Sequence, residues 1–73
     1  MTAIERTQRA FQDADDEWSR QLQRYFGKNA GDIRYTIKGM GEPGSPLRAA
    51  YYGFKAAQLD WEAAILQARI DAK

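Results

Sequence analysis

The sequence contains no cysteine and no histidine, and these two absences remove most of the side chains that enzymes use for chemistry. Without cysteine there is no disulfide, no thiol nucleophile and no thiolate-bound zinc. Without histidine, the commonest metal ligand and the commonest general base are missing as well. We therefore predict that the chain is not an enzyme, and that it uses no metal, no other cofactor and no small-molecule substrate.

Long apolar runs are also absent, and charged residues such as Glu5, Arg6 and Arg9 occur at the beginning of the chain. We expect no signal peptide and no membrane span, and hence a location in the cytoplasm.

The 73 residues are 44% hydrophobic and include two Trp, four Tyr and three Phe, which is typical of a folded chain. A single small domain over 1–73 is predicted, whose limited core would gain from a partner or from self-association.

Two segments have helical periodicity, and we predict helices at about 3–26 and about 46–71. The first opens with a capping box formed by Thr2 and Glu5, and the second opens with Ser45 followed by proline. In each helix, bulky apolar residues or alanine recur every seven positions. These series are Ile4, Phe11, Trp18 and Tyr25, and then Leu47, Phe54, Trp61 and Ala68. One antiparallel register pairs every member of one series with a member of the other, so the fold class is mainly α, an antiparallel helical hairpin.

The connecting segment 28–44 is long for a helical hairpin. Within it, apolar Ile33, Tyr35 and Ile37 alternate with polar residues, which predicts a short strand-like segment at 33–37. No second strand is evident to pair with it. The segment either folds back onto the hairpin or forms an edge that adds to a strand of a partner.

The second helix also carries a second apolar stripe, which makes its apolar arc too wide for contact with one other helix. The stripe consists of Tyr52, Leu59, Leu66 and Ile70. It either packs inside the domain or forms a face for a partner or a second copy of the chain.

Charge is distributed unevenly along the chain. Residues 20–55 contain seven basic and two acidic residues, a balance of +5 within a total of +1. The loop end of the hairpin is therefore expected to be electropositive. Because aromatic residues interleave with these cations, direct binding of nucleic acid by the loop end is the alternative function.

An acidic run lies on the first helix and consists of Asp13, Asp15, Asp16 and Glu17. It lacks the residue spacing of a metal site, and it is expected to be a solvated face or a contact for a basic partner.

The whole-chain pattern resembles a family of small regulators of host RNA polymerase that lytic tailed phages encode. The resemblance covers the acidic segment 13–18, the Tyr25-Phe26-Gly27 tripeptide, the segment 30–36 and the segment 44–47. It implies a protein of the host bacterial cytoplasm that binds RNA polymerase near the β′ N-terminus and the β flap. It further implies displacement of the σ factor at initiation, and antitermination later.

If the chain binds a partner, the candidate contacts lie on the loop and on the second helix. The candidates are Arg34, Tyr35, Lys38, Tyr52 and Lys55, with Asp15 and Asp16 as an alternative face for basic partner segments. A third interpretation is a phage structural or adaptor protein that self-assembles through the stripe on the second helix.

Overall fold

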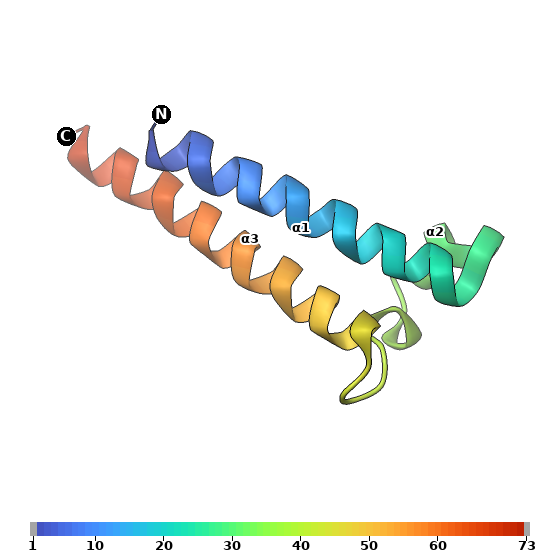
Figure 1. Cartoon of the computed structure of the whole chain (residues 1–73). Helices are drawn as coiled ribbons and strands as arrows, with labels where there is room; N and C mark the ends of the chain where they lie inside the picture. The colour runs from blue at the N-terminus through green and yellow to red at the C-terminus, as the bar shows by residue number, and fades with distance from the viewer. Residues whose placement is uncertain (1, 73) are drawn as a thin grey trace.

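Two long helices lie side by side in the computed structural model, which describes residues 2–72: α1 (Ala3–Phe26) and α3 (Pro46–Asp71). They run antiparallel and form a rod of 45 × 20 × 20 Å, with the start of α1 and the end of α3 at the same end (Figure 1). The connecting segment contains the 3₁₀ turn η1 (Gly27–Asn29), the one-turn helix α2 (Ala30–Ile33) and the 3₁₀ turn η2 (Ile37–Met40). The predicted helical hairpin and its two helix spans are confirmed.

Side chains near the helix ends fix where each long helix begins. The Glu5 backbone N–H donates to Thr2 Oγ1 at 3.1 Å, and the Thr2 backbone N–H donates to Glu5 Oε1 at 3.4 Å, which completes the predicted capping box. Ser45 Oγ accepts from the Arg48 backbone N–H at 3.1 Å, with Pro46 at the first helical position. These caps satisfy backbone donors that have no partner within the helix.

Aromatic contacts set the register of the two helices at mid-length. The rings of Phe11 and Trp61 stack with centroids 5.2 Å apart, and those of Trp18 and Phe54 lie 4.8 Å apart. Both pairs belong to the predicted register, which is therefore confirmed at its centre. Each pair adds roughly 0.5–1.5 kcal/mol beyond the apolar area that it buries.

The helices lie further apart toward the loop end, where the connecting segment leads from one to the other (Figure 1). Tyr25, at the last turn of α1, is about half exposed, whereas Leu47 at the start of α3 is buried. Leu47 is covered by the connecting segment, because the backbone of Gly41 lies directly against it. The buried core is correspondingly small and lies toward this end; it consists of Trp18, Leu22, Ala30 and Leu47.

The predicted strand-like segment at 33–37 is wrong, since none of the residues 2–72 is in a strand. Ile33 ends α2, a turn follows, and Ile37 begins η2. A lone strand would leave its backbone groups without partners, and short helical turns satisfy them locally instead. The Thr36 N–H donates to Ile33 O at 2.9 Å, and the Gly39 N–H donates to Thr36 O at 3.1 Å. The segment folds back onto the hairpin, but only Ile33 of the three alternating apolar residues packs against the core.

Gly39 joins the connecting segment to α1. The Trp18 indole N–H donates to Gly39 O at 2.9 Å in a buried hydrogen bond. Gly39 is itself buried, and a Cβ atom there would lie 2.5 Å from Ile33 O. The position therefore requires glycine for lack of space.

Within residues 2–72, neither long helix has a stretch apolar enough to cross a lipid bilayer.

We predict that Gly39→Ala lowers the free energy of unfolding by about 1–3 kcal/mol, because its methyl group must displace the backbone at Ile33. The matched control is Gly31→Ala in α2, where an added Cβ meets nothing within 4 Å. That substitution should leave stability equal or slightly higher. Urea unfolding followed by circular dichroism measures both, and equal stabilities of the two variants would contradict the close packing at Gly39.

Candidate interaction site at the loop end

Arg34 attaches the connecting segment to the hairpin. Its guanidinium lies 4.3 Å from the centroid of the Trp18 ring and 5.5 Å from that of Phe54. It donates to Ser19 Oγ at 2.9 Å and forms an ion pair with the Asp15 carboxylate. Arg34 and Asp15 were predicted on two alternative binding faces, but the structure pairs them with each other. Both side chains therefore hold the loop in place. A partner could bind either of them only after this ion pair is broken.

Two large apolar side chains of the connecting segment point into solvent. Tyr35 and Ile37 are each 86% exposed, more than any other large hydrophobic residue among the described residues. The anchored residues Arg34 and Gly39 lie on either side of them in the chain. Since exposed apolar side chains of this size are costly in water, a fixed pair of them is typical of an interaction surface.

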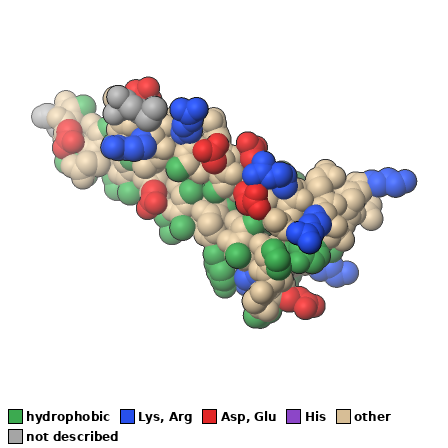
Figure 2. All heavy atoms as spheres, viewed as in Figure 1, with side chains coloured by type: hydrophobic (Ala, Val, Ile, Leu, Met, Phe, Trp, Pro, Cys, Tyr) green, Lys and Arg blue, Asp and Glu red, His purple; other side chains and the backbone are tan. Residues whose placement is uncertain are grey.

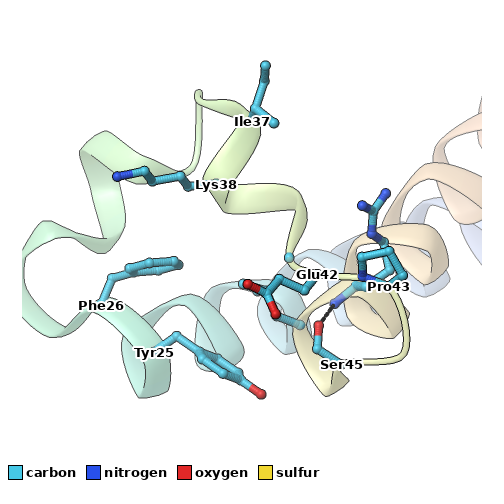
Figure 3. A pocket seen from close by; sticks show the side chains of 10 residues that line it. Tyr25, Phe26, Ile37, Lys38, Glu42, Pro43 and Ser45 are labelled. Atoms are coloured by element: carbon cyan, nitrogen blue, oxygen red, sulfur yellow. Dashed lines mark hydrogen bonds between the residues drawn. The ribbon is translucent and has the colours of Figure 1, made fainter.

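A pocket of about 630 Å³ lies between the end of α1 and the start of α3. Figure 3 shows Tyr25 and Phe26 on one side of it and Glu42, Pro43 and Ser45 on the other. Its lining is mainly apolar, with Leu47 among the residues that form it, so it suits an apolar side chain of a partner. Ile37 also borders the pocket, although its side chain points away from the centre in Figure 3.

Cations outnumber carboxylates around this pocket. Lys38 and Arg48 line it together with a single acidic residue, Glu42. Arg48 Nη1 donates to Tyr52 Oη at 3.2 Å, and its guanidinium lies 5.4 Å from the centroid of the Tyr52 ring. The pocket rim is therefore electropositive, as the charge pattern of the sequence predicts.

The remaining predicted site residues are only partly brought together. Lys55 shares a second, shallow hollow of about 530 Å³ with Arg34 and Tyr35, and its Nζ donates to Gln58 Oε1 at 3.2 Å. Tyr52 is exposed on α3, and Asp16 is exposed on α1. Tyr35, Lys38 and Lys55 thus form one continuous region with the two hollows, whereas Asp16 lies outside it.

Two residues of the acidic run on α1, Asp15 and Glu17, make contacts within the chain. Glu17 accepts hydrogen bonds from Gln21 at 3.0 Å and from Arg20 at 2.7 Å. These hydrogen bonds, that from Gln21 first, hold the pKa of Glu17 below its ordinary value. The described residues contain no group of three or more His, Cys, Asp or Glu side chains that could bind a metal ion.

Sequence reasoning did not select Ile37, Phe26 or Trp18 as residues of the site. Ile37 belongs to the segment for which a strand-like conformation is predicted, and that prediction leaves open whether its side chain packs on the hairpin or stays exposed. A signal for Trp18 was available, since a tryptophan in the middle of a core helix needs an acceptor for its indole N–H. The identity of that acceptor, Gly39 O, depends on the path of the connecting segment.

No protein-family model, curated protein or solved structure matches the chain.

We predict that Arg34 and Asp15 couple energetically more strongly than the other ion pair of α1, Arg20 with Glu17. Arg34 is only 20% exposed, whereas Arg20 is 68% exposed and its pair is screened by water. A double-mutant cycle with alanine at Arg34 and Asp15 should give a coupling of about 0.5–1.5 kcal/mol in urea unfolding.

The matched cycle at Arg20 and Glu17 should give a clearly weaker coupling, because water screens this exposed pair. Equal couplings in the two cycles would show that Arg34 does not anchor the segment.

Proposed function

We propose that the chain is a protein-binding regulator that occupies a partner's surface through its loop end and performs no catalysis. The observation that carries this proposal is the exposure of Tyr35 and Ile37. Both belong to a segment that hydrogen bonds of Arg34 and Gly39 fix to α1. Burial of such a side chain in a partner contributes roughly 1.5–3 kcal/mol. Because Arg34 and Gly39 fix the backbone on both sides, little ordering entropy remains to be lost on binding.

The partner we propose is bacterial RNA polymerase in the host cytoplasm, with contacts in the N-terminal region of β′ and at the β flap. This choice is supported by the resemblance to phage regulators in the segments 13–18, 25–27, 30–36 and 44–47. The electropositive rim at Lys38 and Arg48 supports a partner surface that carries carboxylates, since complementary charge speeds encounter and fixes orientation.

Inhibition would then arise by competition with the σ factor for the polymerase. A regulator that binds only the form of the enzyme without σ shifts the equilibrium according to its concentration relative to its Kd. The same bound state, if it persists during elongation, would account for antitermination.

We predict that the double variant Tyr35→Ser, Ile37→Ser binds RNA polymerase at least about tenfold more weakly, because two buried apolar contacts are lost. Stability should be unchanged, since both side chains are exposed. Fluorescence anisotropy of labelled protein titrated with core polymerase measures the affinity. Ala10→Ser on α1 is the control, as it alters an exposed apolar side chain far along the helix from the loop.

Equal affinities of the double variant and the control would remove Tyr35 and Ile37 from the interface. Absence of binding to the polymerase by the unaltered chain would refute the choice of target. Retention of nucleic acid instead, with affinity that falls steeply as salt is added, would identify the loop end as a nucleic-acid site.

A further inference from the structure

The face of α3 that points away from α1 carries a regular apolar stripe. Six residues follow the alternating four- and three-residue spacing of a coiled-coil seam: Tyr52, Ala56, Leu59, Ala63, Leu66 and Ile70. At about 100° per residue, all six lie within an arc of roughly 80°. We call these six residues the outer stripe. Its spacing is that of a helix surface that packs lengthwise against another helix.

The outer stripe is exposed along its whole length, and its four large side chains are between 57% and 65% exposed. Phe54 and Trp61, which pack against α1, lie on the opposite side of α3. Figure 2 shows hydrophobic side chains along the α3 side of the molecule. The hairpin therefore uses one apolar face of α3 and leaves the second without a partner among the described residues.

We propose that a second copy of the chain covers the outer stripe, with its α3 helix running antiparallel. One register then pairs Tyr52 with Ile70 of the second copy, Ala56 with Leu66 of the second copy, and Leu59 with Ala63 of the second copy. The two-fold axis repeats each contact in reverse, so all six positions of both stripes are used. Each alanine faces a leucine, and the summed side-chain volume is equal in the four central layers.

A parallel pair would fit less well. It would place Ala56 against Ala56 and Ala63 against Ala63, with Leu59 and Leu66 each facing its own copy. Layers of two alanines leave gaps beside layers of two leucines, and such gaps lose packing energy. The alternation of small and large residues thus favours an antiparallel dimer of α3 helices. Such a dimer has closed two-fold symmetry, and it buries the outer stripe of both copies.

The dimer should be weak, because one pair of helices buries less area than a standard interface. Like charges also flank the stripe in this register, since Lys55 lies near Arg69 of the second copy and Glu62 near Glu62 of the second copy. We expect a Kd between about 10 µM and 1 mM. This association does not depend on the proposed function, since it uses neither Tyr35 nor Ile37.

Sedimentation equilibrium of the full chain up to about 1 mM tests the proposal, with three variants beside the unaltered chain. Leu59→Glu, which places a charge in the seam, should weaken the dimer at least about tenfold. Ala56→Leu should also weaken it, because leucine would then meet Leu66 of the second copy and overfill the layer. In a parallel pair, Ala56→Leu would fill a gap and strengthen association. Ala10→Leu on the exposed side of α1 is the control and should change nothing.

A monomer at every concentration would overturn the proposal, as would an unchanged dimer in Leu59→Glu. Stronger association of Ala56→Leu would overturn the antiparallel arrangement. Because the substituted side chains are exposed, circular dichroism should show the same helix content in all variants, so a loss of dimer reports on the interface rather than on folding.

Discussion

The arrangement of this chain depends on the environment of one side chain, Trp18. Its ring packs against Phe54 of the opposite helix, its face receives the guanidinium of Arg34, and its indole N–H donates to Gly39 O. One residue of α1 therefore contacts both α3 and the connecting segment. Loss of the partner of a buried N–H costs about 1–3 kcal/mol, which is a large fraction of the stability of so small a chain. The position of the loop is thus tied to the packing of the hairpin.

Apolar surface remains exposed in two separate places, for two different reasons. The core is confined to a few residues near the loop end, and α1 can cover only one face of α3. Tyr35 and Ile37 are then left in solvent by the anchored loop, and the outer stripe is left in solvent by the two-helix geometry. The two surfaces differ in kind. The first consists of Tyr35 and Ile37 beside an electropositive rim, and we propose a different protein as its partner. For the second, we propose another copy of the same chain.

The helices could be predicted from the sequence, whereas the path of the connecting segment could not. Capping at Thr2 and Ser45 and the seven-residue repeat are local signals, and they determined both helix spans and the central register. The segment 33–37 alternates like a strand, but alternation alone does not supply a partner strand, and local turns satisfied its backbone instead. The structure brings Tyr35, Lys38 and Lys55 to two adjoining hollows, and their role as partner contacts stays a prediction. The pairing of Arg34 with Asp15 joins residues far apart in sequence, and no local pattern reveals it.

Trp18 and Arg34 dock the connecting segment on the hairpin without any partner. Hydrogen exchange of the two indole N–H groups, followed by nuclear magnetic resonance on the free protein, measures this docking. Trp18 donates to Gly39 O, whereas Trp61 Nε1 is buried but has no hydrogen-bond partner among the described residues, so it serves as an internal comparison for burial without a hydrogen bond. We expect the Trp18 N–H to exchange more slowly than that of Trp61. Exchange of the Trp18 N–H at the rate of a free indole would contradict it, because the connecting segment would then be undocked in the free chain.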